Sequence, residues 1–258
     1  MNRHAIGIDI GGSSIKCALV DLDKGQLAGE RRTTSTPAMS AAQDMYAAIA
    51  SVLPPDTGAL AAGLAFPGVI KAGVVKTAAH IAKSWLDHPL TKTAAAHLDR
   101  DVVALNDADA AGLAEMRYGA GRDAGGTALV LTLGTGIGSA LFVDGHLVPN
   151  TELGHLEVDG IEAELRAAAR IRVEQELDWS SWLRALELVI NRMHSLLWPD
   201  LVVLCGGITS DHPQLARELA CHCPIKVGEL RADAGLVGAA LATTLSRGAW
   251  LRPQVAQP

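Results

Sequence analysis

One segment, Ala128 to Glu157, constrains the fold more than any other part of the chain. It begins with an apolar run, Ala128 to Leu133, which is short and branched enough to be a buried strand. Glycines follow at positions 134, 136 and 138, and a second apolar run, Ser139 to Val143, predicts a returning strand. Asp144-Gly145 is then a strong signal for a two-residue hairpin. The segment therefore predicts an antiparallel meander whose first turn is rich in glycine.

The start of the chain repeats this plan. Predicted strands at 5–10 and 15–21 are joined by Gly11-Gly12-Ser13-Ser14, and a further strand is expected near 26–32. The string GGSSIKCALVD aligns without a gap with GTGIGSALFVD, which begins at Gly134. This weak internal similarity suggests two halves built on one plan. Two such hairpins facing each other would hold one phosphate chain from both sides.

The rest of the sequence alternates between predicted strands and helices. Apolar runs predict strands at 60–66, 102–105, 201–205 and 225–228. Periodic apolar positions and helix-stop signals predict helices at 41–53, 90–98, 108–117, 162–177, 182–197, 213–220 and 234–245. Because this alternation follows an antiparallel meander, we expect an α/β fold with a mixed sheet.

Composition excludes several classes of protein. The chain of 258 residues is long enough for one large domain or two modest ones, and its net charge of −6 does not indicate a nucleic-acid partner. Its apolar runs are far shorter than a membrane span, so we expect no membrane partner. Because a predicted strand begins at Ala5, we expect neither a signal peptide nor an added N-terminal domain.

The cysteines do not indicate a metal site. Cys17 and Cys205 lie inside apolar strand-like runs, where a small buried hydrophobic role is the ordinary one. Cys221-His222-Cys223 resembles a fragment of a metal site, but a second pair of ligands with suitable spacing is missing from the sequence. We therefore expect a reducing, cytoplasmic location.

Asp9-Ile10-Gly11-Gly12 places a carboxylate at a strand end beside a glycine turn. Glycines let backbone N–H groups converge on an anion in a nest, Asp9 can face a metal ion on the same phosphates, and Lys16 is a nearby cation. An ordinary hairpin is the alternative for one such turn, and the second turn at Gly134 favours phosphate. Neither turn matches a P-loop or a dinucleotide-binding fingerprint.

Two further groups of polar residues are candidates for a site. Asp107 follows Asn106 between a predicted strand and a predicted helix, where a carboxylate can accept a proton from an attacking hydroxyl or merely cap the helix. Glu152, His155 and Glu157 offer donors and acceptors suited to sugar hydroxyls, although such a group can also form a surface turn. Glu-x-x-His on a helix can bind metal, but Gly154 disfavours a regular helix.

Several strings together resemble the ROK family of sugar kinases: DIGGSSIK, NDADAAGLAE, LTLGTGIGSALF and ELGHLE. The longer strings VPNTELGHLEVDG, WPDLVVLCGG and AGLVGAAL are similar to its polyphosphate glucokinase branch, which includes polyphosphate/ATP glucomannokinases. The resemblance covers roughly residues 6–241. It implies an actin-like, hexokinase-type fold with two α/β domains around a cleft, usually as a homodimer. The expected domains are 1–107, completed by the helix near 234–245, and 108–233.

The resemblance also implies roles for these residues. Asp107 would be the catalytic base for the sugar 6-hydroxyl, and Asp9 would hold Mg²⁺ through water. Residues expected to hold the sugar are Gly68, Asn106, Glu152, His155 and Glu157. Those expected to hold phosphate are Gly11, Gly12, Ser13, Lys16, Gly134, Thr135 and Gly136, with Gly206 and Gly207 near a nucleotide.

The implied reaction phosphorylates glucose at O6, with mannose left open, using polyphosphate at least as well as ATP. An ATP-only ROK glucokinase or other hexose kinase, and an idle sugar-binding or regulatory ROK protein, remain alternatives. Regulatory members carry an added DNA-binding helix-turn-helix, which we do not expect here because a predicted strand begins at Ala5.

The chain departs from the family pattern in places. Many ROK proteins follow Gly-His with a cysteine-rich zinc motif, whereas residues 158–176 contain no cysteine, so we expect no structural zinc. His80, Ala82, Ser14 and Cys205 also differ from the residues usual in the family, which leaves sugar and donor preference open. Cys205 is larger than the usual glycine and is expected to weaken ATP more than polyphosphate. Candidate cations for a polyphosphate channel are Lys16, Lys83, Arg117, Arg122 and Arg231.

Overall fold

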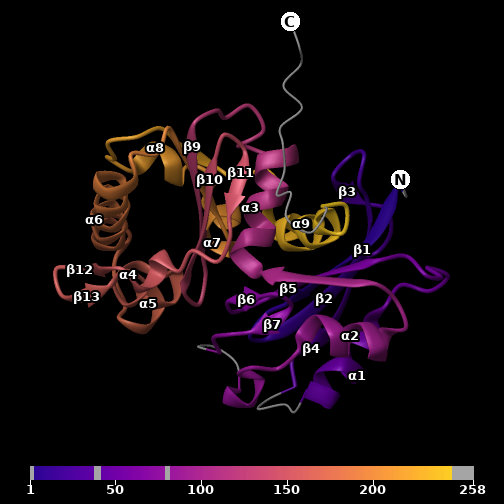
Figure 1. The fold of residues 1–258 in the computed structure, drawn as a ribbon. Helices are drawn as coiled ribbons and strands as arrows, with labels where there is room; N and C mark the ends of the chain where they lie inside the picture. The colour runs from indigo at the N-terminus through magenta and orange to yellow at the C-terminus, as the bar shows by residue number, and fades with distance from the viewer. Residues whose placement is uncertain (1–2, 38–41, 79–81, 246–258) are drawn as a thin grey trace, which may run out of the picture. The chain divides into compact units, whose positions relative to one another are not determined.

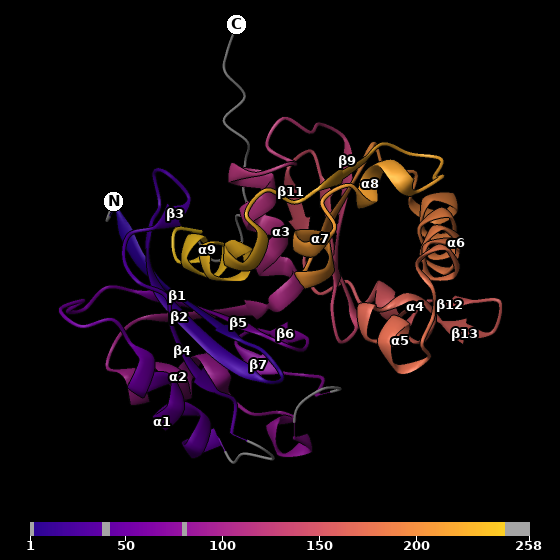
Figure 2. The same cartoon turned by 180° about the vertical axis from the view of Figure 1, so that it is seen from behind.

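A computed structural model describes residues 3–37, 42–78 and 82–245, which form two compact units (Figures 1 and 2). Within the described residues, the first unit comprises 3–114 and 233–245, and the second comprises 115–232. The boundary falls inside helix α3 (Asp107–Tyr118), whereas the sequence places the domain junction near Asp107. His80, one of the departures from the family pattern, lies outside the described residues.

The first unit is built on a mixed sheet. Its strands lie in the order β3-β2-β1-β5-β8, with β4 also paired to β2. The strands are β1 (His4–Ile10), β2 (Ser14–Asp21), β3 (Gln26–Leu27), β4 (Arg32–Ser35), β5 (Ala62–Phe66) and β8 (Val102–Asn106). Strand β1 is antiparallel to β2 but parallel to β5, which is parallel to β8. A small hairpin, β6 (Ile70–Lys71) and β7 (Val74–Val75), and a 3₁₀ turn, η1 (Lys83–Trp85), follow β5.

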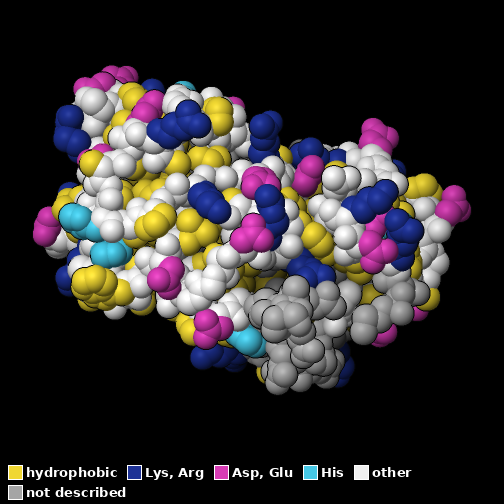
Figure 3. All heavy atoms as spheres, turned by 90° about the horizontal axis from the view of Figure 1, so that it is seen from above, with side chains coloured by type: hydrophobic (Ala, Val, Ile, Leu, Met, Phe, Trp, Pro, Cys, Tyr) yellow, Lys and Arg dark blue, Asp and Glu magenta, His cyan; other side chains and the backbone are white. Residues whose placement is uncertain are grey.

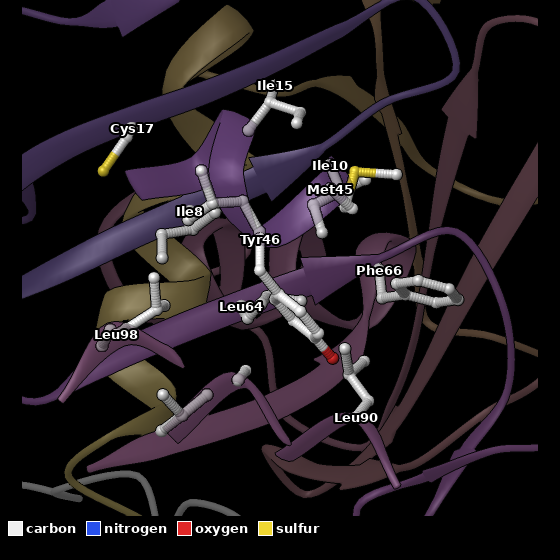
Figure 4. Close-up of a cluster of buried hydrophobic side chains, with 14 of the residues drawn as sticks. Ile8, Ile10, Ile15, Cys17, Met45, Tyr46, Leu64, Phe66, Leu90 and Leu98 are labelled. Carbon is white, nitrogen blue, oxygen red and sulfur yellow. The ribbon is translucent and has the colours of Figure 1, made fainter. Parts of the chain in front are cut away.

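Side chains on alternate residues face opposite sides of this sheet. Ile8 and Ile10 of β1 and Leu64 of β5 join one buried cluster with residues of α1 (Ala42–Val52) and α2 (Leu90–Leu98), as Figure 4 shows. Both helices therefore cover this face of the sheet. At its centre the Tyr46 ring meets the Trp85 ring edge to face, with 6.0 Å between centroids.

Helix α9 (Ala234–Ala242) covers the other face, and its closest contacts there are with glycines. A Cβ placed on Gly7 would lie 2.1 Å from the carbonyl oxygen of Leu236, and one on Gly63 would lie 1.6 Å from that of Ala239. Gly238 makes the reverse contact, because a Cβ there would lie 1.6 Å from the carbonyl oxygen of Ala110. Backbone thus packs directly on backbone, which permits a closer approach than side chains allow.

The second unit repeats the strand plan of the first. Its sheet has the order β11-β10-β9-β14-β15. The strands are β9 (Thr127–Leu133), β10 (Ile137–Val143), β11 (His146–Val148), β14 (Leu201–Cys205) and β15 (Ile225–Val227). Strand β9 is antiparallel to β10 and parallel to β14, as β1 is to β2 and β5. Both units therefore contain the mixed α/β sheet expected from the sequence.

The hairpin predicted at Asp144-Gly145 is confirmed. Both residues have positive φ, 49° and 75°, as a type I′ turn between β10 and β11 requires. The long helix α6 (Trp179–Leu197) is also confirmed, and its apolar stripe, which includes Trp182, Leu186 and Ile190, lies fully buried against the sheet of the second unit.

The single helix predicted at 162–177 is wrong. The segment forms β13 (Ile161–Glu162), α4 (Ala163–Ala167) and α5 (Ala169–Glu174), separated by an extended Ala168 with ψ of 151°. The indole N–H of Trp182 donates to the carbonyl oxygens of Ala167 and Ala168, at 3.2 and 3.4 Å. A tertiary hydrogen bond thus engages carbonyls that a continuous helix would have used. The helix expected at 213–220 is likewise shorter, as α8 (Leu215–Glu218), and α7 (Gly207–Asp211) precedes it.

The described residues contain no helix long and apolar enough to cross a membrane.

The glycine contacts of α9 generate a test of stability. Gly63→Ala should lower the free energy of unfolding by more than about 2 kcal/mol, because overpacking of a dense interior costs about 1–3 kcal/mol and here the obstacle is backbone. Gly29→Ala is the matched control, since a Cβ there meets nothing within 4 Å. Urea unfolding of both variants measures the difference. Equal stability of the two variants would contradict the packing of α9.

Candidate active site

The expected site residues of the first unit lie at the carboxyl ends of three neighbouring strands. Strands β1, β5 and β8 run parallel, and their last residues are followed by the Gly11-Gly12 turn, by Pro67-Gly68 and by Asp107. Asp9 of β1 lies opposite Ala65 of β5. The next residue of β5, Phe66, lies opposite Asn106 of β8. Ligands of α/β sheets bind outside this edge because the loops there converge.

Asn106 organises the end of β8. Its side chain is buried, and its Oδ1 accepts the backbone N–H groups of Ala108 at 2.8 Å and Asp109 at 3.0 Å. These are the bonds of a helix N-cap, so Asn106 caps α3. Its Nδ2 donates to the carbonyl oxygen of Gly68 at 3.3 Å. An amide nitrogen carries two hydrogens, so the expected contact of Asn106 with a sugar hydroxyl is compatible with both bonds.

Asp107 therefore does not provide the main cap of the helix. It is the first residue of α3 and half-buried, and its Oδ1 accepts the N–H of Ala108 at 2.9 Å. A carboxylate at this position is stabilised by the positive end of the helix dipole. With Asn106 as cap, the placement of Asp107 is compatible with general-base work as well as with a local structural role.

Gly68 must be glycine for a steric reason. A Cβ there would lie 2.6 Å from the carbonyl oxygen of Thr77, whose side-chain oxygen accepts the N–H of Val69 at 2.9 Å. The segment that follows β5 is thus held against residue 77 on one side and Asn106 on the other.

Asp9 and Lys16 pair with each other. They are opposite in the register of β1 and β2, and Nζ of Lys16 lies 3.2 Å from Oδ2 of Asp9. Their side chains are 17% and 31% exposed, so solvent reaches the carboxylate. A carboxylate oxygen is the donor that Mg²⁺ prefers, and a partly solvated one suits a contact through water. Asp9 therefore fits the expected indirect metal role.

The two glycine turns are not nests formed by left-handed residues. Gly11, Gly12, Gly134 and Gly136 do not appear among the described residues with positive φ. The N–H of Gly11 instead donates to Ser14 at 2.9 Å, and that of Gly134 donates to Gly136 at 3.0 Å. Any phosphate contact must therefore come from the other N–H groups of each turn, such as those of Ser13 and Thr135. A Cβ on Gly12 or on Gly134 meets nothing within 4 Å, so a ligand can approach the backbone there.

Gly206 fits closely beside the end of β9. Its φ is +108°, and a Cβ there would lie 2.3 Å from the carbonyl oxygen of Leu133. Strands β9 and β14 are parallel neighbours, so Gly206-Gly207 follows β14 at the same edge as the Gly134 turn. The nucleotide and phosphate residues expected in the second unit are thus brought together at one edge of its sheet.

The segment around His155 is fixed to strand β10. Oγ of Ser139 donates to the carbonyl oxygen of Thr151 at 2.7 Å and accepts the N–H of Leu153 at 3.0 Å. A Cβ on Gly154 would lie 2.2 Å from the carbonyl oxygen of Ile137, so only glycine fits there. The result is a single 3₁₀ turn, η2 (Leu153–His155), in place of a regular helix.

Two carboxylates flank the His155 ring. Nδ1 lies 3.1 Å from Oε2 of Glu162, and Nε2 lies 3.8 Å from Oε2 of Glu152. The hydrogen bond with Glu162 raises the pKa of His155 above its ordinary value, with smaller contributions from the charges of Glu164 and Glu152. Glu157 begins β12 (Glu157–Val158), where it is exposed and opposite Glu162 in the register.

Glu162 is a residue that the sequence analysis missed. Asp159 and Gly160, with φ of 49° and 74°, form a tight turn that pairs Glu157 with Glu162 across β12 and β13. Asp-Gly between two short extended runs is the hairpin signal already used at Asp144-Gly145. Applied here, it would have placed Glu162 beside the candidate sugar residues.

His155, Glu162 and Glu164 lie close enough to share one cation, with their ligand atoms within 4.8 Å of one another. One nitrogen and two carboxylates differ from the thiolate-rich donor set of structural zinc sites. The expectation of no structural zinc stays a prediction that metal analysis can test.

Comparison with known proteins places the sequence in a defined group. The model of the ROK family matches residues 5–224. A polyphosphate glucokinase of Mycobacterium tuberculosis (strain CDC 1551 / Oshkosh) is 43% identical over 242 residues, which cover 93% of this chain and 91% of that protein.

Solved structures agree with this match. The crystal structure of the inorganic polyphosphate/ATP-glucomannokinase from Arthrobacter sp. strain KM superposes with a TM-score of 0.89 at 44% identity, covering 94% of this chain and 99% of that one. A ROK family glucokinase from Streptomyces griseus has a TM-score of 0.75 at 23% identity, covering 92% and 98%, and supports the fold alone. These matches confirm the actin-like α/β fold that the sequence resemblance implies.

The raised pKa of His155 predicts a pH-dependent contribution to stability. The charged pair with Glu162 contributes fully below the ordinary histidine pKa of 6.5 and is lost as pH rises through the raised value. The difference in urea midpoint between wild type and His155→Gln should therefore be larger near about pH 5.5 than near about pH 9. Because both side chains are partly exposed, the effect should stay within about 1 kcal/mol.

A matched control is Glu174→Gln, whose carboxylate pairs with Arg170 at 3.9 Å in α5. The difference in urea midpoint between wild type and Glu174→Gln should not change with pH in the way expected for His155→Gln. If His155→Gln shifts the urea midpoint equally at both pH values, the result would contradict a charged pair between His155 and Glu162.

Proposed function

The chain belongs to the ROK family, and from that membership we propose that it is a hexokinase-type enzyme that phosphorylates glucose at O6 with polyphosphate or ATP as donor. The observation that carries the proposal is the end of β8, where Asn106 caps α3, donates to Gly68 and is followed by Asp107 as the first residue of the helix. Mannose is a second acceptor to be tested, because the similar Arthrobacter enzyme is a glucomannokinase.

In this proposal Asp107 accepts the proton of the sugar 6-hydroxyl as that oxygen attacks the terminal phosphorus. Transfer of a phosphoryl group passes through a loose transition state, so positioning and neutralisation of charge contribute more than covalent chemistry. Asn106 and Gly68 would orient the acceptor next to the base. The Gly11-Gly12-Ser13 turn and Lys16 would hold the phosphates. Asp9 would hold Mg²⁺ through water, and the ion would neutralise phosphate charge.

The second unit would contribute the other contacts. Glu152, His155 and Glu157 would bind sugar hydroxyls, with carboxylates as acceptors and the imidazole as donor or acceptor. The Gly134-Thr135-Gly136 turn would bind phosphate, and Gly206-Gly207 would lie beside a nucleotide. The open space at Gly134 and the adjacency of Gly206 to Leu133 support these assignments.

The donor preference rests on the similarity to polyphosphate-using enzymes. Cys205 packs inside the second unit, where its Sγ is buried and lies 2.8 Å from where a Cβ on Gly228 would be, and its expected effect on ATP stays a prediction. A polyanion needs local cations, and Figure 3 shows basic and acidic side chains interspersed on the face it draws. Of the candidates, Arg122 already pairs with Glu229 at 2.6 Å and Arg117 lies over the Tyr118 ring. Lys16, Lys83 and Arg231 stay candidates for contacts with polyphosphate.

Assembly and location complete the proposal. The family resemblance supports a homodimer. The domains expected from the sequence, 1–107 completed by the helix near 234–245 and 108–233, stay a prediction. A cytoplasmic location is supported by four cysteines that are all thiols, as is usual in a reducing compartment.

The role of Asp107 is tested by Asp107→Asn. The amide has nearly the shape of the carboxylate, so the fold and the affinity for glucose should stay near those of the wild type. The kcat should fall by roughly 10²–10⁴, the usual contribution of a general base. Asp101→Asn, which changes an exposed carboxylate just before β8, is the matched control and should keep wild-type kcat. Near-normal kcat in Asp107→Asn would remove this residue from the mechanism.

The donor is tested by measuring kcat/KM for glucose phosphorylation with polyphosphate and with ATP at one fixed salt concentration. Polyphosphate should work at least as well as ATP. Its KM should rise with ionic strength more steeply than the KM for glucose, because the Debye length shrinks from about 10 Å at 0.1 M to about 3 Å at 1 M salt. Activity with ATP alone would indicate an ordinary ROK glucokinase. Activity with neither donor would indicate an idle sugar-binding or regulatory protein.

A further inference from the structure

We infer that Glu162 is a positioning residue for His155: its carboxylate holds the imidazole through Nδ1 and directs Nε2 to the side where Glu152 lies. This inference rests on the proposed function, because it gives His155 and Glu152 a sugar ligand. It adds a residue from β13 that the ROK resemblance did not assign.

The geometry supports a directional role. The ring has two nitrogens, and each faces a different carboxylate, with Glu162 at 3.1 Å from Nδ1 and Glu152 at 3.8 Å from Nε2. The Glu162 contact has hydrogen-bond length, whereas the Glu152 contact does not. An Nδ1–H donated to Glu162 fixes the orientation of the ring whether it is neutral or protonated, and it also fixes the tautomer when the ring is neutral. Nε2 then remains on the side of Glu152, where a hydroxyl can lie between the two groups.

The backbone that carries Glu162 is itself well defined. The tight turn at Asp159-Gly160 pairs Val158 with Ile161 and Glu157 with Glu162, so the position of Glu162 is set by a strand register and not by a loose loop. On the other side, Ser139 and Gly154 fix the turn that carries His155. Two independently anchored segments thus meet at one hydrogen bond.

The groups that raise the pKa of His155 are three carboxylates. Glu152 precedes η2, Glu162 belongs to β13 and buried Glu164 belongs to α4. Arg166, also on α4, donates to the carbonyl oxygen of Val158. The arrangement favours a protonated ring at a pH where a histidine is ordinarily neutral.

A shared cation is the competing role for Glu162, because His155, Glu162 and Glu164 can reach one ion. The two roles predict different outcomes. A positioning carboxylate needs the hydrogen bond to Nδ1, which a glutamine oxygen can also accept. A metal ligand needs the charge, and a metal on Nδ1 would displace that proton.

The experiment compares wild type, Glu162→Gln and Glu162→Ala, with Glu174→Ala as control, by ¹⁵N NMR of the histidine rings in ligand-free protein. In wild type and Glu162→Gln, Nδ1 of His155 should show the shift of a hydrogen-bonded N–H, and in Glu162→Ala this signal should be lost. Both variants should lower the pKa of His155. The control should match wild type.

Kinetics on the same proteins provide the second readout. Glu162→Ala should raise the KM for glucose about tenfold, the loss expected for a hydrogen bond to a charged group, with a smaller change in kcat. Glu162→Gln should stay close to wild type, which would be rescue by the conservative variant. An unchanged Nδ1 signal and an unchanged KM in Glu162→Ala would overturn the inference.

Metal analysis distinguishes the positioning role of Glu162 from the binding of a shared cation. Stoichiometric metal in protein purified without added metal, lost in both Glu162→Gln and Glu164→Gln, would also overturn the inference. If the protein phosphorylates no sugar, the NMR arm still decides. An Nδ1 signal that depends on Glu162 would then support the positioning contact while the proposed function fails.

Discussion

Direct packing of backbone on backbone, between α9 and the first sheet, is the constraint on which the first unit depends. Gly7 and Gly63 let the sheet approach the backbone of α9, and Gly238 lets α9 approach the backbone of α3. The close approach also brings Gly235 next to Asp9. A Cβ built on Gly235 would lie 3.1–3.4 Å from the atoms of the Asp9 carboxylate. The helix that packs on β1, β5 and β8 therefore lies close to the strands whose ends carry Asp9, Gly68 and Asp107.

Much of the fold could be predicted because its signals are local. The Asp144-Gly145 hairpin needs positive φ at both residues, and β14 is a short apolar run that is buried throughout. The break at Ala168 could not be predicted, because its cause is the indole of Trp182, a residue of another helix. The ungapped likeness between the two glycine turns correctly indicated that the two sheets share one strand order.

The candidate site was predictable in its residue types more than in its contacts. A carboxylate after a strand indicates either a base or a cap, and only the structure assigns the cap to Asn106. Asp9 was expected to face a metal ion and Lys16 to contact phosphate. The register of β1 and β2 instead places the two side chains opposite each other, where they form an ion pair. Glu162 was missed because its closeness to His155 depends on a turn at Asp159-Gly160, not on spacing along the chain. The roles of these residues in catalysis stay predictions.

The first unit combines two stretches of the chain that are far apart in sequence, so it cannot be completed until late in synthesis on the ribosome. Its sheet is complete once β8 has emerged, but the helix that covers the glycine face is encoded more than a hundred residues later, at Ala234–Ala242. In the described part of the chain the second unit is one continuous stretch, 115–232, and domains generally fold as units during synthesis. The nascent chain therefore exposes the face around Gly7 and Gly63 until translation nears its end.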